Sequence, residues 1–408
     1  MHYNTIIIGA GPAGLFAAQA LGKQKKSVLV LERNRKAGRK LLVSGAGQCN
    51  FTHEGTVEEI LPAYYEKSKF IKKALMTYDN KKIMSFFENA GVPYQIMPNN
   101  KVFPKSMKSQ DILNVLLRAC QKHHVEILYG ELCEDVSVYD GIFTVETSEG
   151  KRYFSDHVVI ATGGNSYAPL GSDGKGYKLA ESFGHTVITP RPALTDVRLK
   201  NTPYKEIAGV SVQQIGLTIW RENKKVKDYT GDLLFTHKGI SGPAVINSSR
   251  WMQKGDLITV NYLYPRTYEE IKKEMGDTLA HRGKEEIQTY LKQYNLPKNL
   301  MLALCQQINL DEHTPCAQIS KETREQIVNQ LTRCPFEINE LGGFHIAMVT
   351  TGGIHLKEVN PTTMESRKQK GLYFVGEVLD VDAETGGYNI QAAFSTGYLC
   401  AQHIAKDK

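Results

Sequence analysis

The sequence predicts an α/β fold in which one main domain is interrupted by an insert. Three observations support this prediction: short apolar runs of the kind found in buried parallel strands, glycine-rich turns directly after those runs, and a change of pattern in the middle of the chain. The chain has 408 residues, of which 41% are hydrophobic and 23% are charged. That length and composition suit a globular protein of two domains, or three with a small insert.

The N-terminal segment predicts a β-α-β unit. Residues 5–8 form a short apolar, β-branched run, and the glycine-rich segment 9–14 follows it. Residues 15–21 combine good helix formers with apolar spacing, and residues 27–31 form a second apolar run that leads into Glu32. A strand, a glycine turn, a helix and a second strand with an acidic end are typical of a Rossmann-like nucleotide-binding unit.

Two further patterns follow along the chain. After Pro190-Arg-Pro192, strand-like alternation over 195–262 gives way to a polar, helical pattern over 266–333. The other segments continue the main domain, with helices expected at 69–90, 109–122 and 177–183, and strands at 125–128, 135–138, 142–145, 157–161, 344–349 and 371–375.

The domain organisation follows from where the buried-strand pattern stops and resumes. We expect a Rossmann-like domain of three layers (ββα) built from residues 1–192 and 337–408. We expect the insert to span 193–336, with a β-rich part at 193–264 and a helical part at 265–336. Because the insert separates two halves of one domain, the substrate-selecting residues are expected mainly within it.

The glycine fingerprint at 9–14 assigns a separate role to each glycine. Gly9 permits the tight turn, Gly11 lets a pyrophosphate approach the backbone, and Gly14 lets the helix pack closely on the strand. Free N–H groups at the helix N-terminus then face the phosphates. Pro12 and Ala13 lie in the same turn and are assigned to the cofactor site with it.

The second strand and the loop after it select the nucleotide. Glu32 is placed to accept hydrogen bonds from ribose hydroxyls and would repel a 2′-phosphate, so FAD or NAD is favoured over NADP. The polar loop 39–52 favours FAD, because it suits an extended cofactor; a tight surface loop is the alternative. Cofactor residues predicted here, together with one position on a later strand, are Arg33, Arg39, Lys40, Ser44, Gly45, Gly47, Asn50 and Val136.

Two later turns extend the predicted cofactor site. Segment 161–164 ends a strand, and segment 376–390 combines an acidic turn, a Gly-Gly loop and the start of a small-residue helix. Glu377 or Asp380 could hold ribityl hydroxyls, and the helix that begins near Asn389 could direct its positive end at the flavin. The residues assigned are Ala161, Thr162, Gly163, Gly164, Gly376, Glu377, Asp380, Gly386, Gly387, Tyr388, Asn389 and Ile390; plain packing loops are the alternative for both turns.

Four motifs together resemble a known family. They are Gly38-Arg-Lys-x-Leu-x-Ser-Gly-x-Gly-x-Cys-Asn-x-Thr52, Ala161-Thr-Gly-Gly-x-Ser-Tyr167, Leu233-Leu-Phe-Thr-His-x-Gly-Ile-Ser-Gly-Pro243, and Gly376-Glu-x-Leu-Asp380 with Gly386-Gly-Tyr-Asn-x-Gln391. The chain thereby resembles the BaiN/YhiN-like family of bacterial FAD-dependent oxidoreductases, within the two-dinucleotide-binding-fold flavoproteins that include fumarate reductase flavosubunits. The resemblance covers essentially the whole chain, and Gln48 departs from it where Arg is common.

The resemblance implies an enzyme, an FAD-dependent oxidoreductase. The expected reaction reduces an unsaturated or carbonyl group of a small apolar substrate, with NAD(P)H as a transient electron donor. No second glycine fingerprint in a β-α-β context is present, so either the nicotinamide enters the substrate pocket or another donor serves. The candidate proton donors are His237 and Tyr388, although a structural histidine and a packing tyrosine are the alternatives.

Composition limits the remaining functions. The seven cysteines lack any C-x-x-C spacing, so neither a disulfide framework nor a metal site is predicted, and a cytoplasmic protein without a membrane span is expected. The net charge of +7 and the lysine-rich stretches 221–227 and 268–299 leave open an RNA-associated flavoprotein whose insert is a nucleic-acid platform. A redox-silent flavin-binding protein is the third possibility, and the sequence predicts no oligomeric state.

Overall fold

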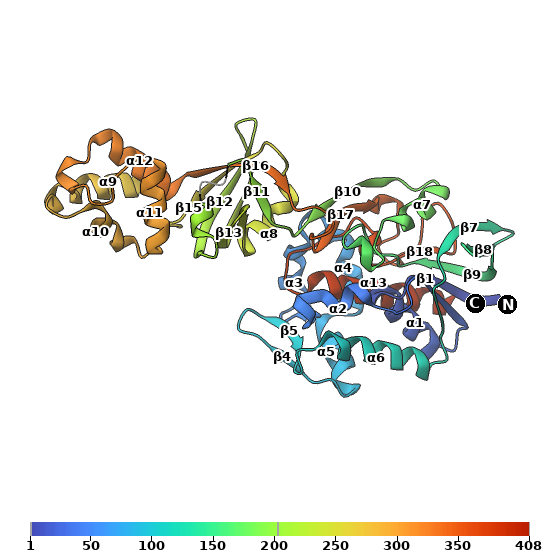
Figure 1. Ribbon diagram of the computed structural model, residues 1–408. Coiled ribbons are helices and arrows are strands. Elements are labelled where there is room, and N and C mark those ends of the chain that lie inside the picture. The colour runs from blue at the N-terminus through green and yellow to red at the C-terminus, as the bar shows by residue number, and fades with distance from the viewer. Residues whose placement is uncertain (1, 202–203, 408) are drawn as a thin grey trace. The chain divides into compact units, whose positions relative to one another are not determined.

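The computed structural model describes residues 2–201 and 204–407, which divide into two compact units. Unit 1 contains the described residues up to Pro192 and those from Phe344 onward, and unit 2 runs from Ala193 to Gly343 (Figure 1). The predicted end of the insert, residue 336, falls inside strand β16 (Cys334–Leu341). The insert is therefore longer than predicted, because β16 still belongs to the sheet of unit 2.

Unit 1 is built on a mostly parallel sheet. Its strand order is β6-β2-β1-β9, with β18 also paired to β9, and Ile6 on β1 lies between Leu29 on β2 and Val158 on β9. The central segments 6–8, 28–31, 158–160 and 372–374 are apolar and buried because both faces of a parallel sheet are covered. Their bounds are β1 His2–Ile8, β2 Val28–Glu32, β6 Glu126–Tyr129, β9 Arg152–Ile160 and β18 Leu372–Phe374.

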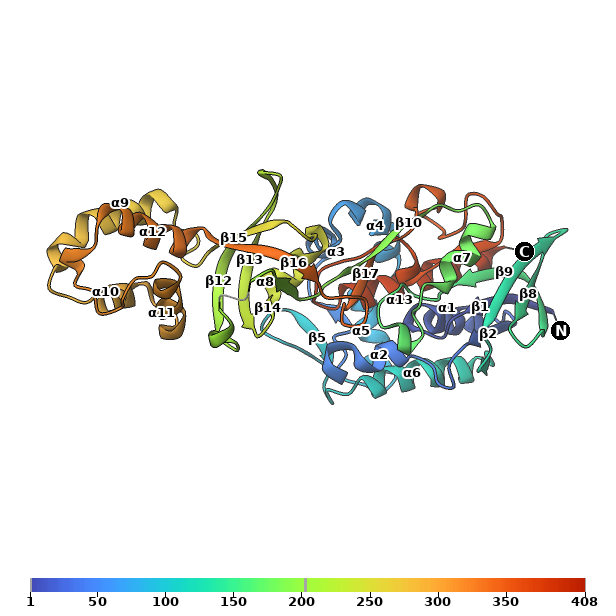
Figure 2. The same cartoon turned by 45° about the horizontal axis from the view of Figure 1, so that its top comes forward.

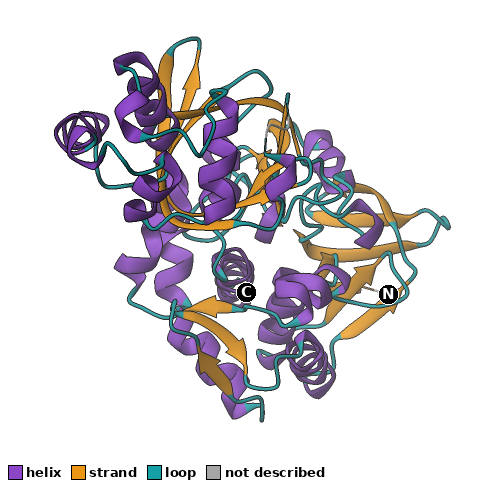
Figure 3. Cartoon of the chain, turned by 60° about the vertical axis from the view of Figure 1, so that its left-hand side comes forward, coloured by secondary structure: helices purple, strands orange, loops and turns teal. Residues whose placement is uncertain are grey.

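A meander of two strands and a layer of helices complete the unit. Strand β7 (Cys133–Tyr139) pairs antiparallel with β8 (Ile142–Thr147), which pairs with the first half of β9. Helix α1 (Pro12–Lys23) packs against both α6 (Ser109–Lys122) and α13 (Tyr388–Lys406). The chain contains both helices and strands (Figure 3), and helices pack on a mainly parallel sheet in unit 1, so the predicted α/β class is confirmed.

The helix predicted at 69–90 is two helices. They are α4 (Ser68–Thr77) and α5 (Asn80–Asn89), separated at Tyr78, whose φ of −137° and ψ of 87° are not helical. Asp79 then caps α5, because its carboxylate accepts a hydrogen bond of 2.8 Å from the backbone N–H of Lys82. The signal for this break was an aspartate in the middle of an otherwise periodic segment.

Two other segments also differ from the prediction. The segment 344–348 is a turn rather than a strand, and β17 (Val349–Ile354) begins after it and pairs with β10 (Val187–Ala193) (Figure 2). Ile346 and Met348 are 37% and 46% exposed, so this apolar run is not a buried strand. The predicted loop at 39–52 begins with a short helix, α2 (Arg39–Val43).

Unit 2 is a closed six-stranded barrel with a helical excursion. Its strand order is β11-β14-β13-β12-β15-β16, and the helices α9–α12 lie between β15 and β16 in the chain and gather at one end of the unit (Figure 1). Strand β16 pairs with both β15 and β11, and it thereby closes the barrel. The bounds are β11 Val197–Leu199, β12 Ser211–Arg221, β13 Lys224–Thr236, β14 Gly239–Ser241, β15 Leu257–Asn261, α8 Pro243–Ser248, α9 Tyr268–Thr278, α10 Ile287–Leu291, α11 Lys298–Gln307 and α12 Lys321–Thr332.

An aromatic cluster anchors the helices of unit 1. Phe16 on α1 is fully buried, and its ring centroid lies 5.1 Å from those of Tyr78 and Phe86 and 5.0 Å from that of Phe394. Aromatic pairs at this spacing stabilise a core beyond the area they bury. The cluster therefore fixes α1 against α13, α5 and the segment just before α5.

Replacement of Phe16 by alanine tests this anchoring. We expect Phe16→Ala to lower the free energy of unfolding by about 3–5 kcal/mol, because a buried aromatic side chain leaves a cavity. Urea unfolding followed by circular dichroism measures the change. The control is Phe154→Ala, whose side chain is 39% exposed and which should cost far less. Equal losses in the two variants would contradict the assignment of the core.

Candidate cofactor site

The three fingerprint glycines are required for different reasons. Gly9 has a φ of 107°, and a Cβ there would lie 2.6 Å from the carbonyl oxygen of Ala161. A Cβ on Gly14 would lie 2.0 Å from the carbonyl oxygen of Gly9. Gly11 has ordinary φ and ψ angles of −82° and −178°, and a Cβ there would meet nothing within 4 Å. Protein packing therefore explains Gly9 and Gly14, whereas Gly11 faces open space.

Helix α1 begins at this space without a capping side chain. Gly11 is the N-cap residue, Pro12 occupies the first turn, and no acidic residue lies in that turn. The N–H groups of the first turn and the positive end of the helix dipole consequently remain available to an anion. This arrangement fits a pyrophosphate.

Glu32 is held at the end of β2 beside the glycine turn. Its carboxylate is 6% exposed and accepts hydrogen bonds of 2.9 Å from the N–H of Ala10, and of 2.8 and 2.7 Å from the backbone N–H and side-chain amide of Asn34. A carboxylate has about four acceptor positions, so roughly one remains for a ribose hydroxyl. The Glu32 side chain is thus fixed in place and keeps a free acceptor position.

The two arginines after β2 tie neighbouring segments together. Arg33 forms an ion pair of 2.5 Å with Asp173, and Arg39 donates hydrogen bonds of 3.0 Å to the side chain of Asn34 and 2.9 Å to the carbonyl of Pro169. Segments 33–39 and 168–173 are therefore joined along one edge of the site.

The carboxylates predicted to hold ribityl hydroxyls are both paired with lysines. Lys40 lies 2.7 and 2.9 Å from the two oxygens of Glu377, which also accepts a hydrogen bond of 2.9 Å from the N–H of Thr350. Lys67 pairs with Asp380, which is 6% exposed and accepts a hydrogen bond of 3.0 Å from the backbone of strand β17. These pairs join four segments of unit 1. Lys67 has no motif around it and was missed by the sequence analysis.

Close backbone contacts bring the C-terminal turn to the N-terminal one. Gly376 has a φ of 74°, and a Cβ there would lie 2.8 Å from the Cβ of Ala13. Gly387 has a φ of 91°, and its Cβ would lie 2.4 Å from the carbonyl oxygen of Thr52. Helix α13 begins at the next residue without a capping side chain or an acidic first turn. The Gly376 turn therefore lies against the first turn of α1, and the uncapped start of α13 lies against Thr52.

Asn389 has a local role in this turn. Its amide oxygen accepts a hydrogen bond of 3.0 Å from the N–H of Ala383, and its amide nitrogen donates one of 3.0 Å to the carbonyl of the same residue. The side chain therefore closes the loop 383–389. Neighbouring Ile390 is half-buried on the first turn of α13.

Tyr388 lies between two aromatic side chains. Its ring stacks on His53 at 4.6 Å and meets Tyr64 edge-on at 6.2 Å, and the Tyr64 hydroxyl donates a hydrogen bond of 2.7 Å to the carbonyl of Tyr388. Burial, reinforced by Glu384, raises the pKa of Tyr388 to about 12, and burial lowers the pKa of His53. Tyr388 consequently keeps its proton at neutral pH. His53 directly follows the Asn50-x-Thr52 motif, whereas nothing in the sequence pointed to Tyr64.

Three buried polar atoms in this region lack a hydrogen-bond partner among the described residues. They are Asn50 Oδ1, Thr162 Oγ1 and Tyr177 Oη. An unsatisfied buried polar group costs about 1–3 kcal/mol. Asn50 and Thr162 were predicted as cofactor residues, so their open valences fit a bound ligand with polar atoms.

The remaining predicted residues occupy different surroundings. Gly163 has a φ of 75°, and a Cβ on Gly164 would lie 2.5 Å from the hydroxyl of Thr350, so the 161–164 turn packs on β17. Ser44, Gly45 and Gly47 lie in a 3₁₀ turn after α2, and Val136 is buried on β7. His237 lies in unit 2, exposed on the turn between β13 and β14, and is not among the residues that unit 1 gathers.

The cysteines contribute no reactive thiol at this site. Cys49 is fully buried, and burial raises the pKa of its thiol to about 12. All seven cysteines are free and buried. None of the described helices has the length and apolar character that a membrane crossing requires.

Comparison with known structures shows the fold. A flavocytochrome c3 fumarate reductase in its open conformation superposes with a TM-score of 0.54 at 15% identity, covering 99% of this chain and 78% of that one. The 3-ketosteroid-delta4-(5alpha)-dehydrogenase of Rhodococcus jostii RHA1 gives a TM-score of 0.54 at 13% identity, covering 99% and 97%. At these identities the likeness establishes architecture alone.

Sequence relatives are more similar and span the whole chain. A ribosomal RNA dihydrouridine synthase of Haemophilus influenzae is 36% identical over 99% of both chains, and one of Escherichia coli is 33% identical over 100% of this chain and 99% of its own. A 3-dehydro-bile acid delta(4,6)-reductase of Clostridium scindens is 30% identical over 98% of both. The model of the HI0933-like protein Rossmann domain matches residues 3–403. The chain therefore belongs to the HI0933-like Rossmann family.

Proposed function

We propose that the chain is an FAD-dependent oxidoreductase that reduces a carbon–carbon double bond conjugated with a carbonyl, using electrons from NAD(P)H. The observation that carries the cofactor assignment concerns Gly11. A Cβ there would contact no protein atom, so packing within the protein does not explain why this position is a glycine. The uncapped end of α1 beside it suits a pyrophosphate, and Glu32 retains an acceptor for a ribose hydroxyl. Bound FAD supplies the two-electron chemistry, and the protein supplies orientation and electrostatics.

The names of the relatives support the reaction class. Reduction of uridine to dihydrouridine saturates a ring double bond that is conjugated with a carbonyl. A delta(4,6)-reductase of a 3-dehydro bile acid acts on double bonds that are conjugated with a 3-oxo group. Both substrates are conjugated carbonyl compounds of different shape. A small apolar enone is the first candidate substrate, as the sequence analysis expected.

A uracil base in ribosomal RNA is the second candidate substrate. It is favoured by two relatives with 36% and 33% identity across essentially their whole length, both named ribosomal RNA dihydrouridine synthase. The reacting group of uracil needs the same chemistry as the enone, so one cofactor site serves either substrate. The two candidates differ in how the remainder of the substrate is held.

Tyr388 is the proposed proton donor. Its hydroxyl is protonated at neutral pH, as in an ordinary tyrosine, and burial raises its pKa further, to about 12. His53 and Tyr64 hold its ring in place. The positive end of α13, which begins at Tyr388, would stabilise negative charge on a reduced flavin. His237 remains the alternative donor.

The role of Gly11 is tested by adding one methyl group. We expect Gly11→Ala to retain the stability of the cofactor-free protein, because its backbone angles are permitted and its Cβ meets no atom. FAD affinity, measured by titration of the cofactor-free protein, should fall at least tenfold. In Gly14→Ala the new Cβ would overlap the Gly9 carbonyl, so urea unfolding should show lost stability instead. Undiminished FAD binding by Gly11→Ala would refute the pyrophosphate assignment.

The reaction is tested by anaerobic half-reactions followed at the flavin absorption band. NADH or NADPH should bleach the band, and a 3-oxo-delta(4,6) steroid or a uridine-containing ribosomal RNA fragment should restore it. Saturated analogues of the same compounds should not. If dithionite-reduced protein is reoxidised by neither conjugated acceptor, the proposed reaction is wrong.

The proton donor is tested in the second half-reaction. We expect Tyr388→Phe to slow reoxidation by the acceptor about 10²-fold or more, the usual size of a general-acid contribution, while reduction by the nicotinamide is unchanged. Tyr398→Phe on the same helix is the matched control and should behave as the unmodified protein. A large effect of His237→Ala with none from Tyr388→Phe would reverse the assignment.

A further inference from the structure

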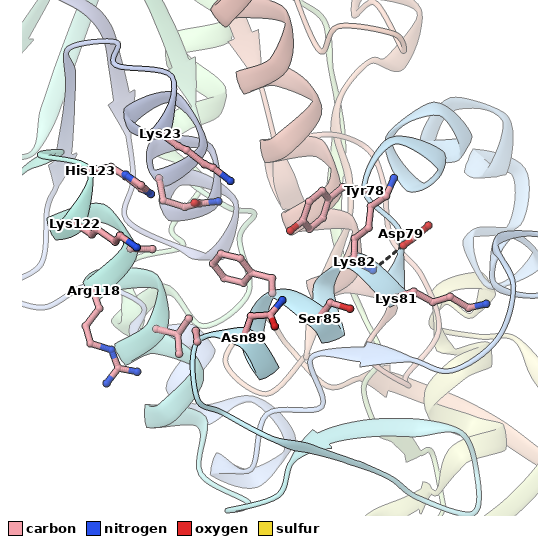
Figure 4. A pocket seen from close by; sticks show the side chains of 15 residues that line it. Lys23, Tyr78, Asp79, Lys81, Lys82, Ser85, Asn89, Arg118, Lys122 and His123 are labelled. Carbon is pink, nitrogen blue, oxygen red and sulfur yellow. Dashed lines mark hydrogen bonds between the residues drawn. The ribbon is translucent and has the colours of Figure 1, made fainter.

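A groove of about 880 Å³ opens on unit 1 between α1, α5 and α6. Figure 4 shows Lys23, Lys122 and His123 on one side of it, and Tyr78, Asp79 and Lys82 on the other. Ser85 and Asn89, on α5, also line the groove. The groove is separate from the cofactor site, because Lys23 ends the 12-residue helix whose other end carries Gly11, and such a helix is roughly 18 Å long.

The groove is basic, and carboxylates are scarce among its described lining residues. Its only carboxylate among the described lining residues is Asp79, which is occupied as the cap of α5. None of four exposed cations takes part in an ion pair within the described part of the chain; they are Lys23, Lys81, Arg118 and Lys122. A cluster of unneutralised cations around one concave surface creates a positive potential that attracts an anion.

Two of the groove's cations stand where a helix disfavours positive charge, whereas Lys23 and Lys122 lie in the last turns of α1 and α6, where the helix dipole favours them. Lys81 and Lys82 lie in the first turn of α5, where the helix dipole disfavours cations, and no acidic residue lies in that turn. His123 shows the resulting field: burial lowers its pKa most, and Lys122 and Lys23 lower it further. Cations kept at an electrostatic cost are expected where a ligand compensates them.

We propose that this groove binds the phosphodiester backbone of RNA. Cations spread over three helices match a chain of phosphates better than a single small anion, which needs convergent donors. The exposed side chains of Ser85 and Asn89 offer a hydroxyl and an amide to sugars, and the half-buried rings of Tyr78 and Phe86 offer surfaces on which a base stacks. A lipid bilayer presents a broad surface and does not enter a concave groove.

The proposal rests on the second candidate substrate of the proposed function and deepens it. Ribosomal RNA would be held by its backbone in the groove, at the opposite end of α1 from the glycine turn. A small apolar enone would make no use of these cations. Binding of RNA to the groove therefore distinguishes the two candidate substrates, and it can be measured without flavin turnover.

The test measures binding of a fluorescein-labelled, single-stranded 20-nucleotide RNA of mixed sequence to the flavin-loaded protein. Fluorescence anisotropy between 50 and 200 mM salt gives the affinity and its salt dependence. We expect Lys81→Glu combined with Arg118→Glu to weaken binding at least tenfold. The slope of log K against log salt should become shallower by about 1.4, since each lost phosphate contact contributes about 0.7 for a single strand.

Both substitutions are compatible with the helices that carry them. A glutamate in the first turn of α5 is favoured by the dipole, and one at position 118 stands four residues before Lys122 on α6. The matched control is Lys357→Glu with Lys370→Glu, which changes the net charge equally at exposed positions of unit 1 outside the groove. The control should bind RNA within about twofold of the unmodified protein.

Each other outcome has a definite meaning. Equal weakening in the groove variant and the control would mean that net charge alone attracts RNA, and it would overturn the proposal. Binding of the unmodified protein to phosphatidylserine vesicles but not to RNA would also overturn it. Bleaching of the flavin band by nicotinamide is measured on the same samples. If RNA does not bind in the groove but the flavin is reduced, the proposed reductase activity is retained. If RNA binds but the flavin is not reduced, the groove is retained and the proposed activity is not.

Discussion

The close approach of helix α1 to its surroundings is the constraint on which unit 1 depends. A side chain at Gly14 would overlap the carbonyl of Gly9, and one at Gly397 would lie 2.4 Å from the carbonyl of Ala13. Gly376 meets Ala13 from the other side. Small residues thus let β1, α13 and the C-terminal turn converge on the first turn of α1. That convergence brings together segments more than 350 residues apart in the sequence.

The helices of unit 1 differ in how their N-termini are satisfied. Thr56 and Glu59 form a reciprocal capping box at the start of the short helix Val57–Ile60. Helices α1 and α13 have neither a capping side chain nor an acidic first turn. The nearby carboxylates Glu377 and Asp380 are instead neutralised by lysines, which keeps the site receptive to a negatively charged cofactor.

Local sequence patterns predicted much of unit 1. Features that depend on pairing between distant segments could not be predicted from the sequence. The β-α-β unit and its glycines were predictable because turn geometry and helix packing act within a few residues. The return of β16 to the barrel was not, since strand pairing across a helical excursion leaves no local signal. Lys67, Tyr64 and Tyr177 reach the site through tertiary contacts alone. The strand predicted at 344–348 was wrong because a local pattern misled. Apolar residues that are exposed in the structure gave the same sequence pattern as a buried strand.

The most direct test of the central claim is the cofactor content of the protein purified without added flavin. The account predicts a yellow protein with the absorption bands of an oxidised flavin and about one FAD released per chain on heating, identified by chromatography against FAD and FMN. A colourless protein that takes up no FAD when the cofactor is added would contradict it. Release of FMN alone would contradict the assignment of Gly11 and α1 to a pyrophosphate.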